Sequence, residues 1–380
     1  MADQYSIGLA VSGGGYRATL YSLGAFWRLN EFGLLPKLKT ITSVSGGSIT
    51  TGYLAVNWDK LIFEASGIAT NFEEVVAKPI QKFCSKSLDV MAGLSGLFSF
   101  SDTIGDKVAK AYDKELFHGV NIQALSDRSP GFLFYGTNYQ TGSSVRIEKS
   151  ALSDYKIGSY PDPDISMAKV VGISSAFPPV MSPVTLETDP AKWVRTDGAI
   201  HFDDIHLRTK LVLTDGGLYD NMGLEAIWKG RGSYSHVLVC DAGAPFSISS
   251  KLKTNWASQL IRMTNVMTDQ QRALRKRTLL YNFKRLDEQG NHEVYGGTYF
   301  GITTQIANYK LDDSLVSDNE LTKSLQNVRT RLNAFNDAEQ GHLINWGYAL
   351  ADTAIRKHVN ELIEGRVYKK PSWPITGYPL

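Results

Sequence analysis

The sequence has few cysteines and no long apolar run. Its 380 residues include two cysteines, Cys84 and Cys240, which lie far apart and form no CxxC pair. Such sparse cysteines favour a reducing compartment and argue against a zinc site. The longest mostly apolar run, at residues 90–100, is far shorter than the ~20 residues that a membrane-spanning helix needs. We therefore expect a cytoplasmic protein that holds no metal and does not cross a membrane.

An excess of charge of one sign is also lacking. The 40 Lys and Arg residues nearly balance the 38 Asp and Glu residues, which gives a net charge of +2. No strong general attraction to nucleic acid is expected from this balance. No basic region precedes the apolar stretch at residues 5–11. Because this stretch leads directly into three glycines, we interpret it as a first β-strand and not as a signal peptide.

Two strand–turn–helix units follow each other at the start of the chain. The first strand runs into Gly13, Gly14 and Gly15, and apolar side chains then recur at helical spacing up to residue 34. A short β-branched run at 39–44 ends in a second tight turn, and residues 48–58 have the pattern of a second helix. This succession predicts an α/β fold, in which a central and mostly parallel sheet is flanked by helices.

Further elements are predicted along the rest of the chain. Residues 60–125 carry no strand signal and are interpreted as a helical insertion, whereas residues 132–150 alternate like a β-hairpin. Three more strands are predicted from apolar runs, at residues 169–184, 210–221 and 236–243. The first of these breaks at its prolines, and the other two end in an aspartate with glycine close behind. From residue 254 onward the chain is expected to be mainly helical, with one short strand near 298–306.

Ser45 lies where the second predicted strand turns into a helix. A serine on such a sharp turn projects its hydroxyl to the edge of the sheet, and the crowded backbone needs small residues on both sides, hence the usual GxSxG pattern. Here Ser43 stands in place of the first glycine, and Gly47 is the second. Ser43 and Ser48 remain alternative nucleophiles. A purely structural role as a helix N-cap is the competing interpretation of Ser45.

Asp215 ends an apolar strand and is followed by two glycines, which allow the backbone to pass close to a neighbour. A carboxylate in this position is suited to act as a general base, because burial would raise its pKa. An ordinary turn is the competing interpretation. Asp197 has a similar Asp–Gly–Ala setting, but the segment before it is less apolar, so it ranks below Asp215.

The three glycines form a turn between a strand and a helix, where backbone N–H groups and the helix dipole attract negative charge. A phosphate and the oxyanion of an ester under attack both fit such a turn. Gly13, Gly15 and Ala18 also satisfy the dinucleotide-binding fingerprint. That pattern requires an acidic residue at the end of the next strand, but no acid lies there and Glu31 falls inside the helix.

Four motifs occur along the chain in a defined order. They are SGGGYR at 12–17, SVSGG at 43–47, SSAFPP at 174–179, and DGG at 215–217 with an asparagine six residues after the aspartate. In this order and spacing they resemble the patatin-like phospholipase family over residues 5–230. The resemblance implies a catalytic domain at 5–230, which contains the insertion at 60–125, and a mainly helical C-terminal part at 231–380 that completes the fold.

The resemblance also assigns roles to individual residues. Ser45 falls on the nucleophile and Asp215 on the base of a catalytic dyad that uses no histidine. The oxyanion hole falls on the glycine turn and the basic residue after it, which are Gly13, Gly14, Gly15 and Arg17. The residues that flank the nucleophile and support the elbow are Ser43 and Gly47. The seven histidines are expected to be structural or solvated. His236 follows Asp215 but begins a strand, at the wrong end of the sheet for the chemistry.

The activity implied by the resemblance is that of a lipid acyl hydrolase of the phospholipase A type. Such an enzyme is a serine esterase that cleaves fatty-acyl esters of membrane phospholipids and needs no cofactor. The expected partner is a phospholipid membrane surface, with the protein in the cytoplasm or peripheral at the inner membrane surface. Two alternatives stay open: a dinucleotide-binding protein that uses the Gly13–Ala18 turn, and a catalytically silent lipid-binding module.

Three further segments carry signals of their own. Residues 256–285 place apolar side chains on one helical face beside several basic residues. This segment could rest on an anionic lipid surface, bind an anionic regulator, or form a core helix with a solvated basic face. Residues 90–100 are expected to form either a lid or buried packing. Residues 329–352 resemble the C-terminal region of certain bacterial patatin-like proteins, some of which are switched on by cyclic nucleotides, so a cyclic-nucleotide activator is a further partner that the resemblance suggests.

Overall fold

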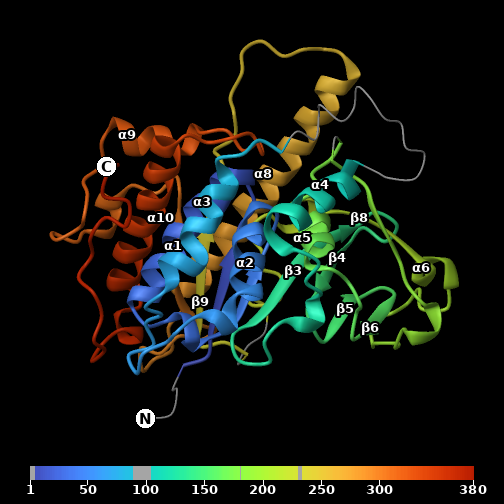
Figure 1. Ribbon diagram of the computed structural model, residues 1–380, viewed down its shortest axis with the longest axis horizontal. Helices are drawn as coiled ribbons and strands as arrows, with labels where there is room; N and C mark the ends of the chain where they lie inside the picture. Colours follow the sequence, from blue (N-terminus) through green and yellow to red (C-terminus); the bar gives the residue numbers. More distant parts are fainter. Residues whose placement is uncertain (1–4, 89–103, 180, 230–232) are drawn as a thin grey trace.

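A ten-stranded sheet lies at the centre of the structure, a computed structural model that describes residues 5–88, 104–179, 181–229 and 233–380 (Figure 1). Its strands are β1 (Ile7–Val11), β2 (Leu38–Ser43), β3 (Gly131–Asn138), β4 (Ser143–Ile147), β5 (Ala151–Asp154), β6 (Gly158–Pro161), β7 (Val184–Glu187), β8 (Lys210–Asp215), β9 (His236–Asp241) and β10 (Gly296–Gly301). The helices are α1 (Gly15–Glu31), α2 (Gly46–Val56), α3 (Lys78–Cys84), α4 (Ile104–Tyr112), α5 (Met167–Ser174), α6 (Ile205–Thr209), α7 (Gly217–Asp220), α8 (Trp256–Phe283), α9 (Glu320–Ser324) and α10 (Asp337–His358).

The parallel centre of the sheet brings several strand ends to one edge. β1 lies between β9 and β2 and is parallel to both, β10 is parallel to β9, and β3 is parallel to β2. β4, β5 and β6 continue from β3 as an antiparallel meander. The turns after β1, β2 and β9 therefore share the carboxyl edge of the sheet, which is where open α/β sheets bind their ligands. This arrangement confirms the predicted fold class.

β8 brings a later part of the chain to the same edge. β3 pairs with β2 through residues 131–134 and with β8 through residues 136–138. β4 pairs with the other edge of β3. β8 therefore pairs with the same edge of β3 as β2 does, beyond the residue where β2 ends. β8 is antiparallel to β3, so it runs toward the end of β2, and its last residue, Asp215, lies opposite Gly136.

Both faces of the sheet are covered, as the side chains of β1 illustrate. Ile7, Leu9 and Val11 pack in the large cluster that includes α1 and α10. Ala10 packs in a second cluster together with Leu279 of α8. All residues of β1 are buried, as expected for a strand with helices on both sides.

α1 and α10 lie side by side and approach each other very closely (Figure 1). A Cβ atom at Gly24 of α1 would overlap the carbonyl oxygen of Ile344, and a Cβ at Gly347 of α10 would overlap that of Tyr21. Glycine at these two positions therefore allows the two helices to pack this closely.

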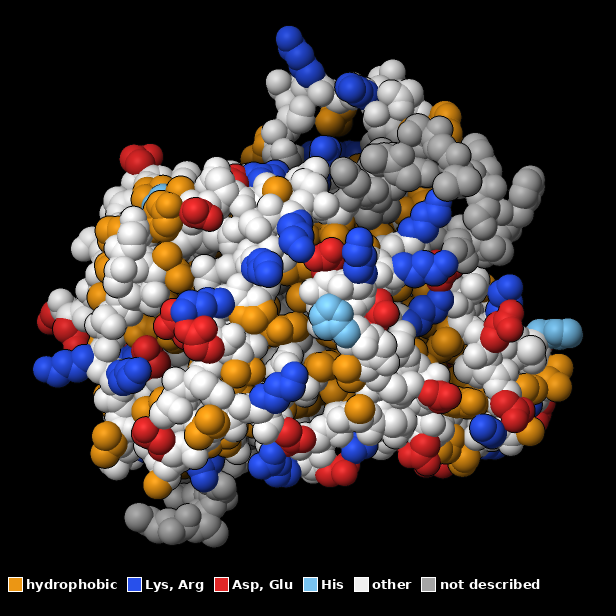
Figure 2. Space-filling view, in the orientation of Figure 1, with side chains coloured by type: hydrophobic (Ala, Val, Ile, Leu, Met, Phe, Trp, Pro, Cys, Tyr) orange, Lys and Arg blue, Asp and Glu red, His pale blue; other side chains and the backbone are white. Residues whose placement is uncertain are grey.

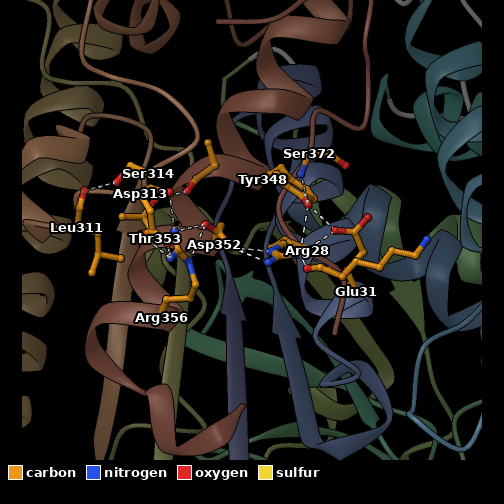
Figure 3. Close-up of polar contacts among 12 residues, drawn as sticks. Arg28, Glu31, Leu311, Asp313, Ser314, Tyr348, Asp352, Thr353, Arg356 and Ser372 are labelled. Atoms are coloured by element: carbon orange, nitrogen blue, oxygen red, sulfur yellow. Dashed lines mark hydrogen bonds and ion pairs between the residues drawn. The ribbon is translucent and has the colours of Figure 1, made fainter. Parts of the chain in front are cut away.

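A buried ion-pair network fixes this helix pair at the end of α1 that is remote from the glycine turn (Figure 3). Arg28 is fully buried and forms ion pairs with Glu31 at 2.9 Å and with Asp352 at 2.8 Å. Asp352 also accepts a hydrogen bond from Arg356 at 3.0 Å. The Tyr348 hydroxyl donates to Glu31. Burial raises the pKa of Glu31, although the contacts with Tyr348 and Arg28 act in the opposite direction.

The strand predicted at residues 169–184 is wrong, because residues 167–174 form helix α5. The Ser166 side chain caps this helix by accepting a hydrogen bond from the N–H of Lys169. Val170, Val171 and Ile173 suggested a strand because they are β-branched. Most of α5 is buried around its whole circumference, so the helical period of apolar residues that would have identified it is missing from the sequence.

The other predicted strands and the hairpin of β3 and β4 are confirmed, except that the strand predicted at 210–221 ends at Asp215 and residues 217–220 form helix α7. Between residues 60 and 125 the described part contains α3, α4 and π-helical turns at Glu73–Ala77 and Asp113–Phe117. The segment at 90–100 lies outside the described residues. Within the four described ranges, no helix has the length and apolar character needed to cross a bilayer.

Candidate active site

The turn between β2 and α2 holds Ser45 in a backbone conformation that is rare for a residue with a side chain. Its φ is 52° and its ψ is −123°, and such strain, of order 1–3 kcal/mol, persists only where the surroundings impose it. Here the Ser45 N–H donates to both the carbonyl oxygen and the hydroxyl of Ser174, each at 3.1 Å. The residue is 9% exposed. This strained strand-to-helix turn is the form that presents a nucleophilic serine in hydrolases.

The turns after β1 and β2 are packed directly against each other. A Cβ atom at Gly46 would overlap the backbone of Gly15, and a Cβ at Gly47 would lie 2.5 Å from the carbonyl oxygen of Ser12. Real Cβ atoms do not approach that closely. The glycines after Ser45 therefore allow its hydroxyl to sit beside the glycine turn.

Asp215 is buried at the end of β8, with 1% of its surface exposed. Its Oδ1 accepts a hydrogen bond from the N–H of Gly217 at 2.6 Å, whereas its Oδ2 is buried and has no hydrogen-bond partner among the described residues. Burial raises the pKa of Asp215 from 3.8 to about 7. The Gly217 N–H and the nearby Ser45 hydroxyl act against this rise and lower the pKa. The fold thus brings the two predicted dyad residues together and gives the carboxylate the proton affinity of a base at neutral pH.

The N–H groups of the glycine turn are used in different ways. The N–H of Gly13 donates to the carbonyl oxygen of Asn221 at 3.0 Å. The N–H groups of Gly14 and Gly15 have no hydrogen-bond acceptor among the described residues, because they precede and begin helix α1. A Cβ atom at Gly13 would lie 3.0 Å from the Cβ of Ser45, so the free N–H groups are close to the serine.

Arg17 is buried, and its guanidinium is directed at backbone carbonyls. Nε and Nη2 donate to the oxygen of Ala242 at 3.1 and 2.8 Å. Nη1 donates to the oxygens of Gln326 and Val328 at 3.1 and 2.8 Å. Arg17 therefore links the start of α1 to the segment after β9 and to a C-terminal segment. In this structure its side chain holds these segments together.

Ser43 and Ser48 are fully buried and bonded to each other at 3.0 Å. The hydroxyl of Ser48 also lies 2.9 Å from that of Ser174, which holds the Ser45 N–H. The two alternative nucleophiles are therefore members of a hydroxyl chain beneath the elbow, and Ser45 is the serine of this turn that retains surface exposure.

The remaining sequence candidates lie away from the dyad or are engaged elsewhere. Asp197 is exposed in a turn, in contrast to the buried Asp215. His236 begins β9, and its Nε2 lies 2.9 Å from Glu361, which is a structural contact. Across the described ranges, no group of three or more His, Cys, Asp or Glu side chains is arranged to hold a metal ion.

Sequence reasoning assigned no role to three residues that shape the site. Ser174 lies in the SSAFPP motif but gave no signal of its contact with the elbow, because the segment was interpreted as a strand. Asn221, six residues after Asp215, places its side-chain oxygen against the Gly13 and Gly217 backbones. The N–H of Gly46 has no acceptor among the described residues, and the general rule that the residue after the nucleophile donates to an oxyanion could have identified it.

Comparison with known proteins shows the family and the fold of the chain. No curated protein sequence matches the chain. Among solved structures, human GIVD cytosolic phospholipase A2 is similar, with 13% sequence identity and a TM-score of 0.58 over 95% of this chain and 60% of that one. The same human enzyme in complex with methyl gamma-linolenyl fluorophosphonate is similar at 14% identity, with a TM-score of 0.54 over 96% of this chain and 60% of that one. At such identities the likeness shows a shared fold, and the chain spans about 60% of the length of these human proteins.

The family itself is shown by the sequence. Residues 9–228 match the family described as patatin-like phospholipase. This range is more than half of the 380 residues and includes both dyad candidates and the glycine turn. Membership supports an activity on lipid acyl esters. The chain belongs to the patatin-like phospholipase family.

Proposed function

We propose that this protein is a serine esterase of the phospholipase A type that hydrolyses fatty-acyl esters of membrane phospholipids. The observation that carries the proposal is that Ser45 lies next to Asp215 and beside the backbone N–H groups of Gly14 and Gly15, which have no acceptor among the described residues. Ser45 occupies a strained elbow, and Asp215 has a pKa of about 7 and a buried oxygen that has no hydrogen-bond partner in the described part of the chain. In the proposed mechanism no cofactor or histidine takes part.

In the first step, Asp215 accepts the hydroxyl proton of Ser45 while the serine oxygen attacks the ester carbonyl carbon. The carbonyl π electrons move to the oxygen, which becomes negatively charged. The N–H groups of Gly14 and Gly15 are free to donate to this oxyanion, and losing one such donor costs about 10²–10³ in rate. Collapse of the intermediate expels the alcohol, which takes the proton back from Asp215, and leaves an acyl–serine ester.

In the second step, Asp215 removes a proton from a water molecule that attacks the acyl–serine. The same N–H groups stabilise the second tetrahedral intermediate. Its collapse releases the fatty acid and returns the proton to Ser45. Gly13 and Arg17 have a supporting part in this scheme, because their donors already bind backbone carbonyls. They hold the glycine turn in place.

Catalysis by an ionised Asp215 makes the rate depend on pH in a defined direction. Protonated Asp215 cannot accept the serine proton, so kcat/KM should rise as pH increases through about 7, the pKa of Asp215. A histidine-independent enzyme should lose no activity when His236, which contacts Glu361, is replaced by Asn. A rate that is constant between pH 5 and 8 would contradict the role of Asp215.

The proposal is tested with a fluorophosphonate probe, followed by intact-mass measurement and peptide mapping. The wild-type protein should gain one adduct on Ser45, and Ser45→Ala should gain none. Asp215→Asn should slow labelling by about 10²–10⁴-fold, the range for loss of a general base. Asp197→Asn, at an exposed aspartate in a similar sequence setting, is the matched control and should label normally.

Hydrolysis is measured in parallel with phosphatidylcholine vesicles and mass spectrometry of the released fatty acid and lysophospholipid. Release should disappear in Ser45→Ala and in Asp215→Asn. An adduct on Ser43 or Ser48 would mean that the nucleophile is misassigned. Lipid release that persists in Ser45→Ala would overturn the mechanism.

A further inference from the structure

The first half of α8 and the loop before it expose a large number of apolar side chains. Ile248 is 92% exposed and Trp256 80% exposed. Trp256, Leu260, Met263 and Met267 follow one face of the helix, and all are exposed. Contiguous exposed apolar surface of this kind usually marks an interaction site. We call residues 246–267 the docking surface.

Charge on the docking surface has a single sign. Lys251 and Lys253 are exposed in the loop, and Arg262 lies on the helix. No Asp or Glu occurs from residue 244 to residue 268. On the face that Figure 2 shows, basic and apolar side chains are visible on the described part that projects at the top of the view. The surface therefore combines apolar side chains with uncompensated positive charge.

The second half of α8 is anchored to the catalytic edge of the sheet. Arg272 forms an ion pair at 2.7 Å with Asp241, the last residue of β9. Arg275 donates to the carbonyl oxygen of Tyr219 at 3.1 Å, four residues after Asp215. From Arg272 back to Trp256 the helix extends about 24 Å beyond this anchor, as the projecting end of α8 in Figure 1 illustrates. The docking surface thus stands at the edge of the sheet that holds the dyad.

We propose that the docking surface binds the anionic headgroup region of a lipid bilayer and so presents the catalytic edge to its substrate. The inference rests on the proposed function. Exposed Trp and Met side chains enter the interfacial region, while the basic side chains meet anionic headgroups. The geometry favours a bilayer over a second copy of this chain, because a two-fold contact would bring the same unpaired basic residues together.

The test measures sedimentation with vesicles of phosphatidylcholine, with and without phosphatidylglycerol. The wild-type protein should bind mainly the anionic vesicles, and raised salt should weaken binding. Lys251→Glu/Lys253→Glu should reduce affinity by at least about 25-fold, at about fivefold for each basic residue lost. Trp256→Ser/Met263→Ser should also reduce binding at least tenfold, because it removes the apolar part. Val367→Ser/Lys370→Glu, which changes exposed residues elsewhere, is the control and should bind normally.

Two further measurements separate the docking proposal from the proposed function. All these variants should hydrolyse a short, water-soluble ester and react with fluorophosphonate at the wild-type rate, because the changed side chains do not touch the dyad. Vesicle binding without any hydrolysis would support docking and contradict the esterase. Ester hydrolysis without vesicle binding, or a wild-type dimer in light scattering that Trp256→Ser/Met263→Ser converts to a monomer, would overturn docking.

Discussion

Replacement of Asp215 by Asn should stabilise the folded protein at pH 8 and at the same time remove its activity. The reason is that Asp215 is buried and its ionised form is disfavoured, which raises its pKa from 3.8 to about 7. The asparagine oxygen can still accept the Gly217 N–H, which now bonds Oδ1. Its amide nitrogen would occupy the place of Oδ2, which has no hydrogen-bond partner within the described ranges. The variant therefore keeps the shape of the site without its charge.

The size of the effect follows from the shift of the pKa. Between pH 3.8 and about 7 the folded protein holds a proton on Asp215 that the unfolded chain has lost. The free energy of unfolding therefore falls as pH rises through this window. Above pH 7 the buried carboxylate lowers the free energy of unfolding by about 4 kcal/mol relative to low pH, and at pH 5 it lowers it by roughly 2 kcal/mol. Asp215→Asn carries no such penalty, so its advantage should grow by about 2–3 kcal/mol between pH 5 and pH 8.

Differential scanning fluorimetry from pH 5 to pH 8 measures this difference. An unfolding entropy of about 2.1 cal/mol/K for each residue makes 2–3 kcal/mol equivalent to about 3 °C in a chain of this length. The Tm of Asp215→Asn relative to wild type should therefore rise by about 3 °C across the range. Asp197→Asn, at an exposed position, should follow the wild type. Parallel Tm curves for wild type and Asp215→Asn would refute the raised pKa, and with it the argument that burial prepares Asp215 as a base.

Two further predictions concern the helix pair behind the site. Arg28→Ala should lower the free energy of unfolding by about 3–5 kcal/mol, because it removes an ion pair from each of two buried carboxylates and leaves Asp352 with Arg356 alone. Tm should fall by several degrees, whereas Arg128→Ala, in an exposed ion pair, should cost less than about 1 kcal/mol. Gly347→Ala should lower Tm by a comparable amount, because its Cβ would overlap the carbonyl oxygen of Tyr21, whereas Gly377→Ala, with nothing within 4 Å, should not. Equal Tm values for the two arginine variants would contradict the role of the buried ion pairs, and equal values for the two glycine variants would contradict the close packing of α1 on α10.

The part of the site that could be predicted from the sequence is built from local structure. The glycine turn and the Ser45 elbow each lie within one strand–turn–helix unit, so residues close in sequence determine them. The apolar run before Asp215 likewise placed the carboxylate at a strand end. Parallel strands then bring such turns to one edge, and at that edge the structure places Ser45 beside the glycines.

The parts that could not be predicted depend on contacts between distant segments. β8 approaches the elbow from the opposite direction to β2, and a strand's direction is not encoded in its own pattern. The tethers from Arg17 to the carbonyls of Gln326 and Val328 join residues at opposite ends of the chain. Helix α5 was hidden because burial on all sides removes the amphipathic period. Each failure therefore reflects tertiary structure and not a misread motif.

The departure of this chain from the GxSxG pattern has a physical consequence for the elbow. Where the pattern has glycine, Ser43 contributes a hydroxyl that bonds Ser48, and Ser48 bonds the Ser174 hydroxyl that accepts the N–H of Ser45. A glycine at this position would remove one of the two hydrogen bonds of the buried Ser48 hydroxyl, which costs about 0.5–1.5 kcal/mol. The substitution therefore does more than fit the available space. It connects β2, the turn that holds Ser45 and α5 through side chains, and so helps to impose the positive φ of Ser45 that the proposed chemistry requires.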